Sequence, residues 1–180
     1  LSNVNLRYAD LTDADLRNAN LPNANLEDAD LTGTNLRAAN LTGAYLSGLF
    51  GVVAIDADWR AANLTGADLG NVDFTGAVLW YVDFTNADLG WADLTRADLY
   101  GANLTDAWLF CADLTSVRLK AADLTNAVLR WAFLTDTDLE DADLTGADFT
   151  AATVTNANFT DTIWSNTKWI DGNIYNTNQA

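Results

Sequence analysis

A period of five residues governs this chain. Leucine occupies every fifth position from Leu1 to Leu46, and a second series runs in steps of five from Trp59 to Trp169. The second series holds fifteen leucines, four phenylalanines, three tryptophans and one valine. The residue two places earlier is small, and in the second series it is alanine at 17 positions and valine or threonine at the others. Because aspartate or asparagine usually stands between the two, the repeating unit is Ala-(Asp/Asn)-Leu-x-x.

This period excludes an α-helix and a flat β-strand. Five residues turn an α-helix by about 500°, so the leucines would spread over every face of it. In a strand, side chains alternate, and leucines five apart would lie on opposite faces. A coil that turns a corner every five residues instead places the leucine and the small residue inside. Asparagine, aspartate, threonine and glycine, which fill the other positions, suit such corners.

The unit, as in Ala67-Asp68-Leu69 and Ala122-Asp123-Leu124, resembles that of the pentapeptide-repeat proteins of cyanobacterial type, and the resemblance extends over residues 1–170. It implies an all-β fold, a right-handed quadrilateral β-helix (solenoid) with four pentapeptides per coil. The chain would then form about nine coils, stacked about 4.8 Å apart into a rod roughly 40 Å long. Threonine follows the central residue in every second unit from Thr65 to Thr155, which predicts two threonine-lined faces and two variable faces.

The two series are separated by thirteen residues, which is two units plus three residues. We therefore expect N-terminal coils at 1–46, an insertion or bulge at 47–58, the main solenoid at 59–170 and a C-terminal tail at 171–180. The apolar residues of the insertion are expected either to fold over the core or to form a docking loop. Trp164 and Trp169 predict a cap on the last coil.

The chain begins at a leucine in mid-repeat, and it contains no methionine. This start indicates a processed or trimmed chain. It also predicts an uncapped N-terminal coil through which copies of the chain could associate. The compartment stays open between export, to a periplasm or thylakoid lumen, and the cytoplasm, because members of the resembled family occur in all three.

Composition excludes several functions. The chain has no histidine, which removes the usual general base and the commonest zinc ligand. The single cysteine, Cys111, excludes an internal disulfide framework, and no apolar run is long enough to span a membrane. The net charge of −16 argues against direct binding to nucleic acid, and the arginines at 7, 17, 37 and 60 are interpreted as too few and too scattered to hold phosphate. We expect neither an enzyme nor a cofactor or metal.

Acidic residues form a ladder with two interpretations. Its members, one coil or a multiple of it apart, are Asp73, Asp93 and Asp113 on one face and Asp83, Asp123 and Asp143 on another. They are either a solvated repeat position or a mimic of duplex DNA, since some members of the resembled family imitate DNA and bind DNA gyrase. The run from Asp136 to Asp143 looks like a calcium loop, but it lacks the glycine of an EF-hand and keeps the five-residue register.

Outward aromatic residues are the strongest candidates for a binding site. The expected patch consists of Trp91, Trp108, Phe110, Trp131 and Phe133, with Cys111 at its centre. A second cluster, of Trp80, Tyr81 and Tyr100, is expected on the opposite side. Such rings either bind a partner or stack as ladders that stiffen the coil. We interpret the chain as a non-enzymatic solenoid that binds or scaffolds a protein partner. The alternative is a DNA-mimicking regulator of DNA gyrase or another topoisomerase.

Overall fold

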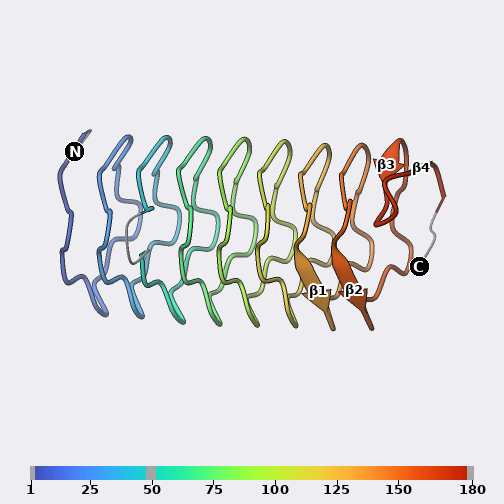
Figure 1. The fold of residues 1–180 in the computed structure, drawn as a ribbon. Helices are drawn as coiled ribbons and strands as arrows, with labels where there is room; N and C mark the ends of the chain where they lie inside the picture. Colours follow the sequence, from blue (N-terminus) through green and yellow to red (C-terminus); the bar gives the residue numbers. More distant parts are fainter. Residues whose placement is uncertain (1–2, 48–51, 178–180) are drawn as a thin grey trace.

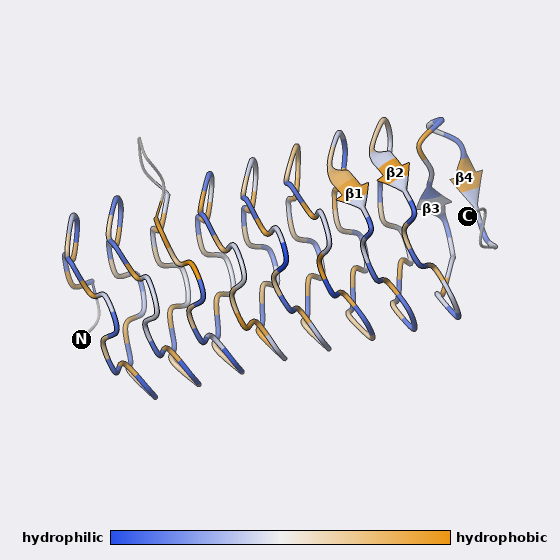
Figure 2. Cartoon of the chain, turned by 90° about the horizontal axis from the view of Figure 1, so that it is seen from below, coloured by the Kyte–Doolittle hydropathy of each residue, from blue (hydrophilic) through white to orange (hydrophobic). Residues whose placement is uncertain are grey.

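In the computed structural model, which describes residues 3–47 and 52–177, the chain winds into a rod of stacked coils with its termini at opposite ends (Figure 1). Parallel bridges join each coil to the next and link residues 20 positions apart, as Asp73 to Asp93, or 23 apart where residues 48–51 intervene, as Asp30 to Val53. A coil of 20 residues holds four five-residue units, so it has four sides, as the family resemblance implies. Apolar residues therefore recur at matching places in successive coils (Figure 2).

Regular strands are short because each side of a coil is only a few residues long. Strand β1 (Phe133–Thr135) pairs in parallel with β2 (Thr153–Thr155), one coil later. Strand β3 (Thr167–Lys168) pairs antiparallel with β4 (Ile174–Tyr175) at the C-terminal end. Within the described residues, no helix is long and apolar enough to cross a membrane.

The corner of each side explains the polar part of the repeat. Where the residue before the central one is aspartate or asparagine, its side-chain oxygen accepts a hydrogen bond from the backbone N–H two residues later, as Asp73 Oδ1 does from Thr75 at 2.9 Å. The second residue after the centre adopts a left-handed backbone, for example at Asn71 with a φ of 61°. Its N–H donates to a carbonyl of the next coil, here that of Gly90 at 2.9 Å. An Asx turn and a left-handed corner together bend the chain every five residues.

The four faces of the rod differ. We call the residues at the same place in successive coils a column. One threonine face is built on the column of Leu94 and the other on the column of Leu104. The aromatic face, built on the column of Leu89 and Leu109, and the arginine face, built on the column of Leu36 and Leu99, lie on opposite sides. The core between them consists of the central and small residues, buried along the rod from Leu21 to Trp169.

The regular solenoid resumes at Val52, so the insertion expected at 47–58 was placed too far along the chain. Val53 bridges Asp30 on one side and Asp73 on the other, and Val52 and Ala54 are fully buried. The physical reason is that alanine takes a central position at Ala54. Two large buried rings compensate for its small volume: Trp59 on the next side and Phe74 in the next coil, 5.3 Å apart and edge to face. The rest of the expected insertion, at 48–51, lies outside the described residues.

The C-terminal end is capped by aromatic packing, as expected. The rings of Trp164 and Trp169 lie 5.0 Å apart, and Trp169 also packs on Phe149 at 5.5 Å. Residues 171–180 do not form a simple tail, because β4 folds back onto β3. The turn between them carries Gly172 with a φ of 80°, and the N–H of Trp169 donates to the carbonyl of Asn173 at 2.9 Å. The expectation of a tail was therefore wrong for the residues that form this hairpin.

Candidate functional site

The structure places the expected aromatic residues on the aromatic face and, for Phe133, on the adjoining threonine face. We define the aromatic surface as Trp91, Trp108, Phe110, Trp131 and Phe133. Phe110 lies at its centre: its ring is 5.3 Å from that of Trp91, edge to face, and 5.9 Å from that of Trp108, stacked. Backbone bonds from Trp91 to Phe110 and from Cys111 to Arg130 hold successive coils in register beneath these rings. Ring contacts thus join Trp91, Trp108 and Phe110, whereas Trp131 lies one coil beyond Cys111 and Phe133 follows Asp113 in a column of a threonine face.

Most of the aromatic surface is open to solvent. Trp91 and Trp131 are each 58% exposed, Phe133 48% and Trp108 43%, whereas Phe110 is half-buried between its neighbours. Exposed aromatic side chains that gather on one face are unusual on a monomer and typical of binding hot spots. Cys111, also half-buried, lies in the same column as Trp91 and Trp131.

Trp91, Cys111 and Trp131 occupy left-handed corners, with φ values of 56°, 57° and 61°. This backbone costs a side chain other than glycine, asparagine or aspartate about 1–2 kcal/mol. Corners of the threonine faces mostly carry the tolerant residues, as at Gly76 and Asn86. The fold itself does not require tryptophan at these corners. Tyr8, Ala61 and Arg96 hold the same backbone, so this strain belongs to the repeat and does not by itself mark a functional site.

Replacing Trp131 with asparagine is therefore expected to raise the free energy of unfolding by about 1 kcal/mol, because asparagine tolerates the left-handed corner. The measurement is urea unfolding followed by circular dichroism. The reverse change, Asn71→Trp, at the corresponding corner of the same face, should lower the free energy by a similar amount. A loss of stability in Trp131→Asn would show instead that this ring contributes to packing.

The second aromatic cluster lies on the arginine face and is tied to the protein by internal contacts. The rings of Tyr81 and Tyr100 are 5.5 Å apart, edge to face, and the guanidinium of Arg118 lies 4.8 Å from the Tyr100 ring. Arg60 lies 5.7 Å from the Trp80 ring. Loss of hydration and then the hydrogen bond with Tyr100 raise the pKa of Tyr81. These contacts hold Trp80 and Tyr100 against the rod, while the Tyr81 side chain remains 59% exposed.

Both columns of the acidic ladder are in the predicted register. Bridges link Asp73, Asp93 and Asp113 on one threonine face, and Asp83, Asn103, Asp123 and Asp143 on the other. Each aspartate accepts the backbone N–H two residues later, at 2.9 to 3.0 Å. Asn103 accepts the same bond from Thr105 at 3.0 Å. The corner thus uses the oxygen acceptor and does not require the charge.

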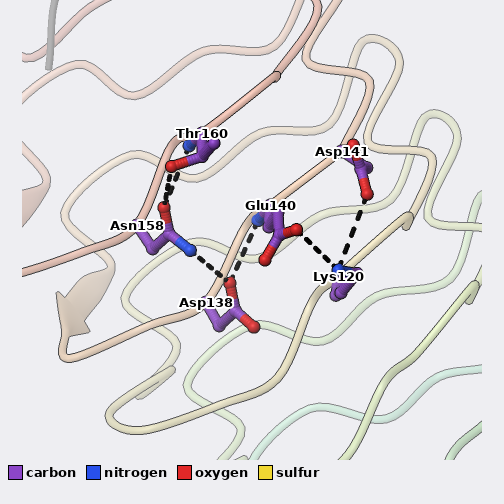
Figure 3. A network of polar contacts seen from close by, with 6 residues as sticks. All are labelled: Lys120, Asp138, Glu140, Asp141, Asn158 and Thr160. Carbon is purple, nitrogen blue, oxygen red and sulfur yellow. Dashed lines mark hydrogen bonds and ion pairs between the residues drawn. The ribbon is translucent and has the colours of Figure 1, made fainter.

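The acidic run from Asp136 to Asp143 is spread around the coil. Lys120 Nζ donates to Glu140 Oε1 at 2.6 Å and lies 3.7 Å from Asp141 Oδ2 (Figure 3). Asp138 Oδ1 accepts bonds from the Glu140 backbone N–H at 3.1 Å and from Asn158 Nδ2 at 3.0 Å. In the part of the chain that the structure describes, no group of three or more aspartate, glutamate, cysteine or histidine side chains is placed to hold a metal ion.

The arginines interpreted as scattered are in fact partly aligned. Bridges join Asp15 to Asn35 and Asn35 to Asp58, so the arginines two residues after them form one column: Arg17, Arg37 and Arg60. Hydrogen bonding from Arg17 lowers the pKa of Asp15 to about 2. Hydrogen bonding from Arg60 likewise lowers the pKa of Asp58, and the more distant charge of Arg37 adds weakly to this lowering. Arg7 lies on the aromatic face, where it pairs with Glu27 at 2.8 Å.

Comparison with known proteins identifies the family. The model of the family Pentapeptide repeats matches eight copies, over residues 1–37, 9–48, 49–80, 73–109, 83–120 and 122–161. The chain belongs to the pentapeptide-repeat family. Proteins of this family fold as right-handed quadrilateral β-helices, in agreement with the four-sided coils described above. No curated protein sequence matches the chain.

Several solved structures are similar to this pentapeptide-repeat protein. HetL, involved in heterocyst differentiation regulation in the cyanobacterium Nostoc sp., is 31% identical, with 97% of this chain and 89% of HetL covered and a TM-score of 0.41. QnrB1, a plasmid-mediated fluoroquinolone resistance protein, is 19% identical, with 89% and 84% covered and a TM-score of 0.63. A protein of the Arabidopsis thaliana thylakoid lumen is 31% identical, with 59% and 71% covered and a TM-score of 0.45. At 19% sequence identity, the similarity to QnrB1 shows a shared fold and nothing more.

Proposed function

We propose that this pentapeptide-repeat protein is a non-enzymatic, rigid binding module and that the aromatic surface docks a protein partner. The observation that carries the proposal is the cluster of exposed rings in which Trp91 and Trp108 both pack on Phe110. These two tryptophans remain 58% and 43% exposed although each contacts the Phe110 ring. Exposed aromatic side chains that gather in this way are typical of binding hot spots.

The surroundings of the aromatic surface suit docking. Its centre is apolar, and the nearby Arg130 is neutralised by Asp148 at 3.1 Å. Trp108 is held against Phe110, so little side-chain freedom remains to be lost when a partner covers these rings. An uncharged centre with a polar rim is the usual arrangement in protein interfaces.

A pull-down from lysate of the cells that make the protein tests this function. The double variant Trp91→Ala/Trp108→Ala should recover the partner at roughly one tenth of the wild-type level, because truncated hot-spot aromatics cost about 2 kcal/mol or more. Tyr8→Ala is the control, since Tyr8 is an exposed aromatic at a left-handed corner of the same face, far from the aromatic surface. Equal recovery by the wild type and the double variant would return the rings to a purely structural role.

DNA mimicry is the second candidate, and the two aligned columns of carboxylates favour it. It has less support than the aromatic surface, because every aspartate of the ladder already serves its own corner as a hydrogen-bond acceptor. A DNA gyrase supercoiling assay separates the two functions. Inhibition at micromolar protein, undiminished in the tryptophan double variant, would favour mimicry over docking at the aromatic surface.

A further inference from the structure

A repeated ion pair on the arginine face is broken at one position. In one coil, Asp15 accepts bonds from Arg17 Nε at 2.8 Å and Nη2 at 2.7 Å. Two coils later, Asp58 accepts bonds from Arg60 Nε at 2.9 Å and Nη2 at 2.6 Å. The coil between them has Asn35 in place of the aspartate, and its side-chain oxygen accepts the backbone N–H of Arg37 at 3.2 Å.

Arg37 is consequently the unbalanced cation of this column. Within residues 3–47 and 52–177 its guanidinium has no carboxylate within ion-pairing distance, whereas its column neighbours each hold one. It borders an open groove lined by Arg17, Asn18, Arg37 and Ala38. Arg37 and Ala38 are both exposed, and the methyl group of Ala38 leaves the groove uncovered.

We propose that Arg37 binds the carboxylate of an acidic side chain in a partner protein, seated in this groove. A carboxylate matches the planar fork of a guanidinium and would complete the pairing already made on either side. One negative charge is what the site lacks. A phosphate, with a charge near −2, would bring more charge than Arg37 can balance between the carboxylates of Asp15 and Asp58.

The local charge around the groove also favours an acidic segment. Around the groove, from Asp15 to Ala61, this face carries three bases (Arg17, Arg37 and Arg60) against two acids (Asp15 and Asp58). Farther along the rod the same face is acidic, with Asp138, Glu140, Asp141 and Asp161, and the whole chain has a net charge of −16. An acidic segment is thus repelled by most of the rod and accepted here. The site lies opposite the aromatic surface and does not depend on the proposed function. With both sites occupied, one rod would hold two partner segments.

Nuclear magnetic resonance of the full chain tests this site, with a blocked pentapeptide that carries one central glutamate as the probe. The Nε–Hε signal of Arg37 should shift saturably, and the effect should weaken as salt is added. The same peptide with glutamine in place of glutamate should cause no saturable shift. A shift of equal size with the glutamine peptide, or tighter binding of inorganic phosphate than of the glutamate peptide, would overturn the proposal.

Two variants with matched controls locate the binding. Arg37→Gln should raise the dissociation constant of the glutamate peptide roughly tenfold or more, whereas Arg96→Gln, the same change at an exposed corner of a threonine face, should leave it within about twofold. Asn35→Asp supplies the missing internal carboxylate and should weaken binding as strongly, with Asn86→Asp as its control. If variant and control lost the same affinity for the glutamate peptide, the effect would come from the net charge of the protein, and this would overturn the proposal. Concentration-dependent dimers that Arg37→Gln abolishes would assign the groove to a second copy and also overturn the proposal.

Discussion

Leu104→Ala is expected to lower the free energy of unfolding by about 2–5 kcal/mol. Leu104 is fully buried at a central position, stacked between Phe84 and Leu124 of the neighbouring coils. The backbone bonds between coils hold these neighbours at a fixed spacing, so they cannot collapse into the space left by the missing methyl groups. The cost therefore includes the cavity as well as the lost burial of the side chain.

Urea unfolding followed by circular dichroism measures this effect, with Leu6→Ala as the matched control. Leu6 has the same position in the repeat but is only partly buried near the N-terminal end of the described rod. Its truncation should cost less than half as much, because less apolar surface returns to water. Equal losses at the two positions would contradict a core whose packing density is greatest along the middle of the rod.

Ala112→Asp should destabilise the protein by about 3 kcal/mol or more, because it places a carboxylate without a partner at a fully buried position. The small residue of each unit points into the core, where its methyl group leaves room only for the central side chains. The buried carboxyl would be stabilised by protonation, so the loss should be smaller at pH 4 than at pH 7.

The same substitution one residue earlier provides the control. Cys111 is partly exposed and has a left-handed backbone that aspartate tolerates, so Cys111→Asp should change stability by less than about 1 kcal/mol. Thermal unfolding of the two variants at both pH values makes the comparison. Similar melting temperatures for Ala112→Asp and Cys111→Asp would mean that the inward and corner positions of the unit had been confused.

The core and the faces were predictable because one period governs both. A side chain every fifth residue decides which positions are buried, and the 20-residue coil decides which exposed residues meet, so Trp91, Trp108 and Phe110 could be grouped before any coordinates existed. Positive φ at the corners was predictable at glycine and asparagine. Its presence at Trp91 and Trp131, which gives the aromatic surface its energetic cost, was not.

The remaining differences between expectation and structure arise where the five-residue period is not visible in the sequence. Ala54 fills a central position without a large side chain, which hid one unit and made the insertion seem to extend to residue 58. The offset across the insertion was then unassigned, so Arg37 and Arg60, 23 residues apart, could not be placed in one column. Asp171-Gly172 is a common turn signal, and it could have revealed the hairpin that ends the described chain.

Disulfide cross-linking to the native Cys111 tests the four-sided register most directly. In the variant Trp91→Cys, the new thiol lies one coil from Cys111 at a Cα separation of about 4.8 Å, within the range that a disulfide bridges. Mild oxidation should link 91 to 111, detected by mass spectrometry of tryptic peptides, while Arg96→Cys, on the next face, should stay reduced. A link from 96 to 111, or thiols at 91 and 111 that both react with an alkylating agent yet do not join, would contradict the account.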